Sequence, residues 1–210
     1  MRDTVLLMQY SYAIAERMNA MTPDQFEEAR HAMVISQLRP DGVTDPRVID
    51  AMSAVPREDY VPADRRATAY ADRIIPIGDG RGINPPVVTG RLLNEAQIKS
   101  SDDILIVGPA NSYTAAVAAL LADSVTVTDT VTNLDGIFDV IMIDGAVDHI
   151  PDSLVEHLAA NGRLVTGIVE AGVTRLAIGR RGGNGFGVVP FMDAEMVILT
   201  EFARPPVFVF

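Results

Sequence analysis

The chain has 210 residues, a formal net charge of −11 and no cysteine, so disulfides and thiolate metal sites are excluded. The acidic balance argues against nucleic acid as a partner. No stretch holds the roughly 20 apolar residues that a membrane span needs. The histidines show no metal-ligand spacing, so no metal site is expected. The length is typical of a single domain over residues 1–210, and a chain without cysteine fits the reducing cytoplasm.

The N-terminal residues allow two interpretations. Residues 1–20 contain a short apolar run that is too interrupted for a signal peptide and predicts an extension helix with one apolar face. Alternatively, the natural start is Met21 and the first twenty residues are an upstream extension. Both interpretations leave residues 21–100 as a mainly helical region that precedes the core at 101–210.

Three main helices are expected within that region, with turns and one short helix between the second and the third. Thr22 caps the first, and Asp45 caps the second with Pro46 in its first turn. A loop rich in glycine and proline, Gly78 to Pro86, is too irregular for sheet or for a long helix. The predicted helices cover residues 22–38, 43–55 and 87–98.

The core opens with a pattern typical of a nucleotide-binding unit. Ile104 to Val107 is an apolar run that predicts a strand buried on both faces. A turn of small residues, Gly108 to Ser112, precedes a helix over 113–122. A second strand over 124–128 ends at an acid, Asp129, 21 positions after Gly108. A carboxylate at that position can accept hydrogen bonds from the hydroxyls of a ribose.

The remaining pattern alternates strand and helix, with a strand over 138–143, a helix over 151–160 and a strand over 162–169. This alternation predicts a parallel, doubly wound α/β sheet. Asn184-Gly185 is a hairpin signal, so the C-terminal strands are expected to be antiparallel.

Five sequence blocks, in order and correctly spaced, resemble the protein-L-isoaspartate O-methyltransferase family. The resemblance implies a Rossmann-like class I methyltransferase fold, with a seven-stranded sheet, a helical N-terminal region and S-adenosylmethionine as cofactor. It also implies methylation of the abnormal carboxylate of isoaspartyl residues in damaged proteins, which starts their repair. The blocks are DPRVIDAM (45–52), VPREDYVP (55–62), YADRIIPIG (70–78), FDVIMIDGAVDHIP (138–151) and SLVEHLAANGRLV (153–165).

The resemblance places the cofactor at the small-residue turn and at the acid after the second strand. The family's turn is G-x-G-x-G, whereas this chain keeps one of the three glycines and carries a proline, which has no amide donor, after it. Ile106 stands where class I methyltransferases carry an acid near the methionine end of the cofactor. The implied cofactor-binding residues are Gly108, Ala110, Asn111, Ser112, Tyr113 and Asp129.

The interval at 130–137 is much shorter than in the family, where it holds a helix, a strand and another helix. The connection must cross two strand spacings, about 10 Å, and return along a strand of about 17–20 Å, which makes a diagonal of about 21 Å. Eight extended residues span roughly 27 Å, so a nearly straight connection closes. We therefore expect one sheet edge to be truncated and the strand over 124–128 to be exposed, where a second copy of the chain could pair with it. Alternatively, residues 124–134 form a different local structure.

The substrate loop differs from the family as well. The family motif carries a hydroxyl residue where this chain has Asn84, within Gly82 to Pro86. A carboxylate nucleophile is already ionised at neutral pH and needs no general base, so its alignment with the methyl group is the main requirement. The implied catalytic residues are Asn84, as an amide donor, and Arg81, which would attract the anionic substrate.

Two alternatives to the repair enzyme remain open at the level of sequence. The altered turn and the short interval are also compatible with a non-catalytic relative that acts through protein interactions. The altered substrate loop is compatible with a methyltransferase that acts on a different small substrate.

Overall fold

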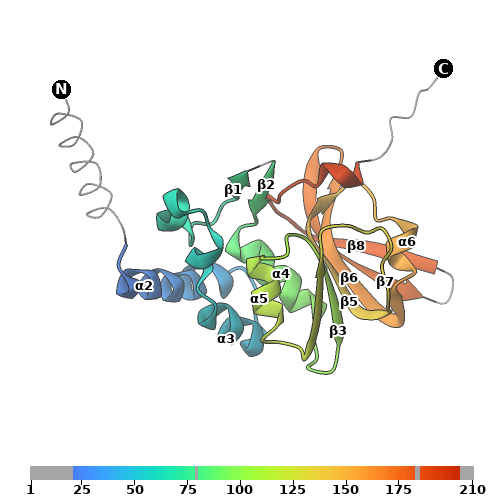
Figure 1. Ribbon diagram of the computed structural model, residues 1–210, viewed down its shortest axis with the longest axis horizontal. Coiled ribbons are helices and arrows are strands. Elements are labelled where there is room, and N and C mark those ends of the chain that lie inside the picture. Colours follow the sequence, from blue (N-terminus) through green and yellow to red (C-terminus); the bar gives the residue numbers. More distant parts are fainter. Residues whose placement is uncertain (1–20, 79, 183–184, 204–210) are drawn as a thin grey trace, which may run out of the picture.

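The computed structural model describes residues 21–78, 80–182 and 185–203. Helices gather in one half of the molecule and a six-stranded sheet forms the other half (Figure 1). The extension helix expected over 1–20 and the Asn184 half of the expected hairpin turn lie outside the described residues. Among the described helices, none has the length and apolar character needed to cross a membrane.

The N-terminal helices begin where their caps predict. Thr22 forms a capping box with Gln25 at the start of α2 (Pro23–Met33), which continues into a π-helical turn at Val34–Leu38. Asp45 accepts from the amide of Arg47 at the start of α3. The remaining helical elements before the sheet are α3 (Pro46–Ala54), 3₁₀ turns at Arg57–Tyr60 and Ala63–Thr68, and α4 (Pro86–Ala96).

The prediction of an irregular loop over 78–86 is wrong for its first half. β1 (Ile75–Gly78) and β2 (Arg81–Ile83) form a two-stranded antiparallel sheet. Gly78 and Gly80 have φ of 106° and 72°, so glycine supplies the backbone conformation that this turn requires. The local glycine and proline content indicated a loop, but the pairing of the two short strands outweighs it.

The six-stranded sheet has the order β4-β3-β5-β6-β7-β8. The four strands from β4 to β6 are parallel, and β7 and β8 are antiparallel additions, as the sequence predicted. The strands are β3 (Asp103–Val107), β4 (Ser124–Thr128), β5 (Phe138–Val147), β6 (Leu158–Glu170), β7 (Val173–Gly182) and β8 (Gly185–Asp193).

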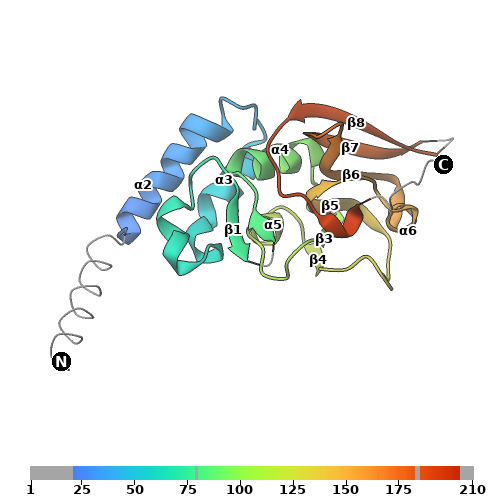
Figure 2. The ribbon, with the colours of Figure 1, turned by 90° about the horizontal axis from the view of Figure 1, so that it is seen from above.

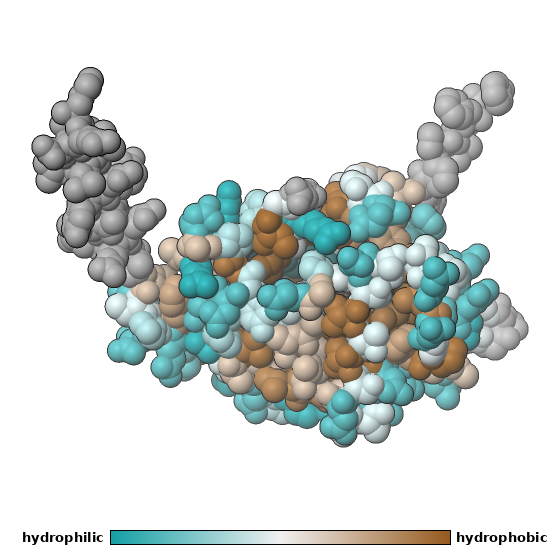
Figure 3. Space-filling view, in the orientation of Figure 1, coloured by the Kyte–Doolittle hydropathy of each residue, from teal (hydrophilic) through white to brown (hydrophobic). Residues whose placement is uncertain are grey.

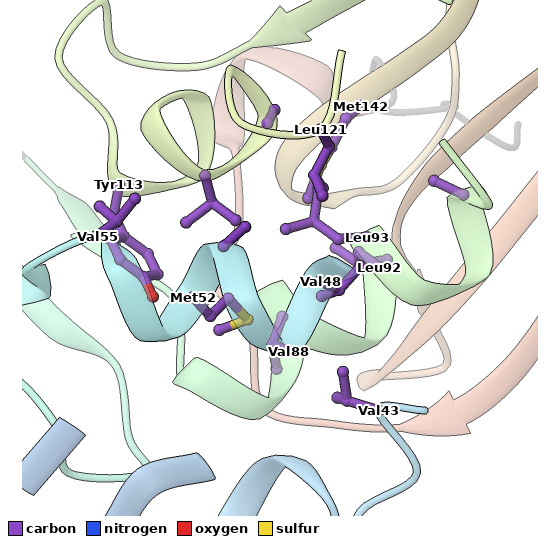
Figure 4. Close-up of a cluster of buried hydrophobic side chains, with 14 of the residues drawn as sticks. Val43, Val48, Met52, Val55, Val88, Leu92, Leu93, Tyr113, Leu121 and Met142 are labelled. Carbon is purple, nitrogen blue, oxygen red and sulfur yellow. The ribbon is translucent and has the colours of Figure 1, made fainter. Parts of the chain in front are cut away.

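The central strand β3 divides the core into two layers. Ile104 and Ile106 point into the layer that contains α3, α4 and α5 (Tyr113–Ala118), whereas Leu105 and Val107 point into the opposite layer. All four side chains are buried, which explains the uninterrupted apolar run. Figure 4 shows the helix-side layer, where Met52 and Val88 pack between α3 and α4.

The predicted helix over 151–160 is wrong beyond its first turn. Only α6 (Asp152–Val155) is helical, because β6 already begins at Leu158, which pairs with Phe138 of β5. The amide of Phe138 donates to the carbonyl oxygen of His157 at 2.8 Å. Strand pairing therefore overrides the helix-forming residues of this segment. The helix expected over 113–122 already ends at Ala118 in α5, whereas the strand expected over 138–143 extends to Val147 in β5.

The predicted truncation of the sheet is confirmed, and the sheet has six strands where the resemblance implied seven. β4 lies at one end of the strand order, and its only strand partner among the described residues is β3. Residues 130–137 contain no helix or strand and cross to β5, with Val131 and Leu134 packed against the second core layer.

A buried ion pair fastens the helical half to the sheet. Arg163 of β6 donates to Asp102 at 2.5 Å and to the carbonyl oxygen of Gln97 at 2.8 Å. It also donates to the carbonyl oxygen of Ala96, the last residue of α4. Gln97 ends this helix in the left-handed conformation, with φ of 48°. One guanidinium therefore satisfies the carbonyl groups at the helix end and neutralises a carboxylate at the start of β3.

Candidate active site

A cavity lies at the carboxyl ends of the three neighbouring parallel strands β4, β3 and β5. Ligands of doubly wound sheets bind at such a position, because the connections diverge there. The cavity brings together three of the predicted site residues, Arg81, Gly108 and Asp129, with two acids that the sequence analysis did not single out, Asp144 and Glu201. Its volume is about 30 Å³, close to that of one water molecule.

Gly108 is retained because two strands approach each other closely at this point. Its amide continues the ladder by donating to the carbonyl oxygen of Thr128 at 2.8 Å. A Cβ atom at Gly108 would lie 3.1 Å from the Cβ of Asp144, tighter than an ordinary contact. Its φ is not positive, so the close approach is the reason for glycine here.

Pro109 also lines this cavity, but the other three residues of the predicted cofactor turn do not. Ala110 and Asn111 are exposed. The Ser112 hydroxyl caps α5 by accepting from the amide of Ala115 at 3.0 Å. The cofactor roles of these three residues remain predictions.

Tyr113 is buried in the helix-side core, so its side chain is also absent from the cavity lining. Its ring meets Tyr60 edge-on at 5.9 Å, and the guanidinium of Arg57 lies 4.8 Å from its centroid. Burial raises the pKa of Tyr113 to about 12, an effect that the nearby Arg57 opposes. Tyr113 therefore stays neutral and packs the start of α5 against the 3₁₀ turn at Arg57–Tyr60.

Asn84 is buried next to the cavity, and both the nitrogen and the oxygen of its side-chain amide form hydrogen bonds. The Nδ2 atom donates to the Asp144 carboxylate at 3.0 Å and to the Asp144 carbonyl oxygen at 3.2 Å. The Oδ1 atom accepts from the amide of Val197 at 2.8 Å. Arg57 donates to the carbonyl oxygen of Asn84. The side chain thus joins the substrate loop, the end of β5 and the C-terminal segment.

Asp144 is the most perturbed acid of the site. Burial raises its pKa above the ordinary 3.8, while hydrogen bonds from Thr114 and Asn84 and the charge of Arg57 act in the opposite direction. No arginine, lysine or histidine among the described residues forms an ion pair with it. A carboxylate thus faces the cavity without a bonded cation.

The segment after β8, residues 194–203, crosses the end of the sheet (Figure 2). Its residues Val197, Leu199 and Glu201 line the cavity. Ala146 of β5 holds it, by donating to the carbonyl oxygen of Val197 at 2.7 Å and accepting from the amide of Leu199 at 2.8 Å. The Leu199 side chain lies directly over Gly145, where a Cβ atom would come within 2.4 Å of its Cγ. A 3₁₀ turn at Thr200–Phe202 ends the cover.

A larger groove adjoins the cavity and shares Arg81, Gly82 and Val197 with it. It has a volume of about 540 Å³ and runs between the β1–β2 hairpin and the C-terminal segment. Its walls are mostly apolar, and its charged residues within the described part of the chain are Arg81 and Glu195. Arg81 is exposed, so its guanidinium can meet a ligand in either space.

The residues that the sequence analysis missed are Asp144, Val197, Leu199 and Glu201. Asp144 had one visible signal, because it directly follows an apolar strand at the same edge of the sheet as Asp129. The other three lie 89 or more positions after Gly108 and carried no local signal. The described residues contain no group of three or more acids and histidines able to hold a metal ion.

Comparisons with known proteins give the same family as the residue pattern. A sequence profile described as protein-L-isoaspartate(D-aspartate) O-methyltransferase matches residues 29–137. The chain is 34% identical over 177 residues to a protein-L-isoaspartate O-methyltransferase of Koribacter versatilis, which covers 70% of this chain and 80% of that relative. It is 30% identical over 203 residues to protein-L-isoaspartate O-methyltransferase 2 of Marinobacter nauticus, covering 82% and 93%.

Solved structures support the fold. A Plasmodium falciparum protein assigned to the same methyltransferase family, crystallised with S-adenosyl-L-homocysteine, superposes with a TM-score of 0.64 at 20% identity, covering 81% of this chain and 98% of that one. A second structure, a protein-L-isoaspartate O-methyltransferase, gives a TM-score of 0.67 at 14% identity, covering 81% and 65%. From the profile match and the identity to relatives over most of their length, the chain belongs to the protein-L-isoaspartate O-methyltransferase family.

Proposed function

We propose that the chain transfers a methyl group from S-adenosylmethionine to the carboxylate of isoaspartyl residues in proteins or peptides. The observation that carries the proposal is the meeting of Gly108 and Asp129 at the carboxyl ends of β3 and β4, in a chain that belongs to this family. Relatives named for this activity are matched over most of their length.

The donor groups of the cavity suit this cofactor. Asp129 is exposed at the end of β4 and would accept hydrogen bonds from the ribose hydroxyls. The cavity volume of about 30 Å³ is far below the roughly 300 Å³ or more of a small-molecule site. The Leu199 side chain must therefore withdraw from Gly145 when the cofactor binds.

The residues around the cavity orient the reactants and supply no general base. When bound, S-adenosylmethionine supplies a methyl group on a positively charged sulfur, which the substrate carboxylate takes up in one displacement that leaves a neutral thioether. Arg81 stands between the cavity and the groove and would attract that carboxylate. Asn84 acts through its hydrogen bonds to Asp144 and Val197, by fixing the floor of the site. The groove offers an apolar surface for an extended peptide.

Calorimetry on the full chain tests the cofactor half of the proposal. Titration with S-adenosylhomocysteine should show saturable binding, and Asp129→Asn should weaken it by roughly tenfold to a hundredfold, since a hydrogen bond to a charged group contributes about 1.5–3 kcal/mol. Asp123→Asn, another exposed acid beside β4, serves as the matched control. Absence of heat at millimolar ligand would instead favour a non-catalytic relative.

A transfer assay tests the substrate half. Radiolabelled methyl groups should appear on a peptide with one isoaspartyl residue and not on the same peptide with normal aspartate. Arg81→Gln should raise the KM for the isoaspartyl peptide more than it lowers kcat, because the proposed role is attraction of the anion. Binding of the cofactor without transfer to either peptide would point to another substrate.

We also infer that a second copy of the chain covers the free edge of β4. An unprotected edge strand offers unpaired backbone groups, and Figure 3 shows apolar side chains among polar ones on the sheet half of the face drawn. Thr126 is exposed on this strand, so Thr126→Lys should shift sedimentation from dimer to monomer, while Thr132→Lys should not. A wild-type monomer at all concentrations would refute the inference.

A cytoplasmic location remains a prediction, supported by the absence of cysteine.

A further inference from the structure

The strand β3 lacks an acid at the position where the family resemblance places one. Ile106 occupies it, is fully buried and belongs to the helix-side core layer. A cofactor with a positively charged methionine end would find no charge there. Any compensating acid must come from another element at the same edge of the sheet.

Asp144 is placed to compensate. Ile106 pairs with Met142 of β5, and both side chains lie in the helix-side layer. Asp144 faces the same layer, because its carboxylate accepts hydrogen bonds from Asn84 and from Thr114 of α5. A Cβ atom at Gly108, two residues after Ile106, would lie 3.1 Å from the Cβ of Asp144, so the acid stands beside the end of β3. A carboxylate so placed remains within reach of a ligand that lies across the ends of both strands.

The charges around the cavity favour a cationic ligand group at this position. Asp144, Asp129 and Glu201 line the cavity, and Arg81 is its single lining cation among the described residues. The Asp144 carboxylate is oriented by the amide of Asn84 and forms no ion pair there. A carboxylate that is fixed in direction, desolvated and without a bonded cation interacts strongly with an incoming positive charge, even though the charge of Arg57 already acts on it.

We propose that Asp144 receives the positively charged end of S-adenosylmethionine, in place of the acid absent at Ile106. The proposal rests on the proposed function and names a cofactor-binding residue for it. It also explains why Asn84 is committed to Asp144: the amide holds the carboxylate toward the cavity.

Calorimetry with three ligands of decreasing positive charge tests the proposal. S-adenosylmethionine carries a sulfonium and an ammonium, S-adenosylhomocysteine keeps only the ammonium, and 5′-methylthioadenosine has neither. Asp144→Asn should weaken the first by about tenfold or more, the second by less and the third hardly at all. Asp123→Asn should change none of the three affinities. If the Asp144→Asn variant does not fold, Asp144→Ser serves as a second neutral variant for the same titrations.

The outcomes separate this proposal from the proposed function. If the wild-type chain binds none of the ligands, the proposed function falls and this proposal with it. If the wild-type chain binds and the folded Asp144 variants lose affinity equally for all three ligands, or lose none, only this proposal is overturned. If the Asp144 variants lose affinity in the order of the ligands' positive charge, the result supports both the proposed function and the role of Asp144.

Discussion

Shortening the side chain that covers the cavity should strengthen cofactor binding. Leu199 lies over Gly145 and is partly buried, so its truncation to alanine removes about half of the 1.5–3 kcal/mol that full burial of a leucine contributes. Because we expect this side chain to withdraw before the ligand binds, destabilising the covered state by about 0.8–1.5 kcal/mol raises the population of the competent state. The dissociation constant for S-adenosylhomocysteine should therefore fall roughly four- to twelvefold.

Calorimetry with wild type, Leu199→Ala and a matched control measures this effect. Leu120→Ala makes the same chemical change at a side chain that is 59% exposed and should leave the affinity unchanged. Gly145→Ala should act in the same direction as Leu199→Ala, since its Cβ would displace the leucine, and the two effects should not add. Weaker binding by Leu199→Ala would show that the leucine is a wall of the occupied site, which contradicts the reasoning.

Three further predictions concern stability. Arg163→Met should lower the free energy of unfolding in urea by about 3–5 kcal/mol, because it leaves Asp102 buried without its cation. The double variant Arg163→Met with Asp102→Leu should recover much of that free energy. A loss below about 1 kcal/mol for the single variant would contradict this prediction. Asp45→Ala should cost about 1 kcal/mol by removing the cap of α3, whereas Asp50→Ala on its exposed face should not. Burial raises the folded-state pKa of Asp144, so its contribution to stability is fully present below the ordinary 3.8 and is lost as pH rises through the folded value. Wild type should therefore lose stability relative to Asp144→Asn as the pH rises above about 3.8; parallel pH profiles would refute it.

Local patterns predicted the parallel core, because burial on both faces leaves a continuous apolar run such as Ile104 to Val107. The same reasoning placed Gly108 and Asp129 at one edge of the sheet, and both line the cavity. The truncated edge followed from chain length alone, since eight residues cannot hold the family's additional strand. These features depend on short stretches of sequence and on the reach of the backbone.

The remainder depends on contacts between distant segments. Asn84 meets Asp144 across 60 positions and Val197 across 113 positions, and no local pattern encodes either pairing. The helix expected after Pro151 gave way at Leu158, because pairing with β5 outweighs local propensity. Sequence reasoning therefore located the edge of the sheet that carries the site, but not the segment that covers it.

A crystal structure of the chain with S-adenosylhomocysteine tests the central claim most directly. We predict ligand density between Gly108, Asp129 and Asp144, with the ribose hydroxyls against Asp129 and the Leu199 side chain withdrawn from Gly145. Unchanged packing of Leu199 on Gly145 at saturating ligand, with no density against Asp129, would contradict it.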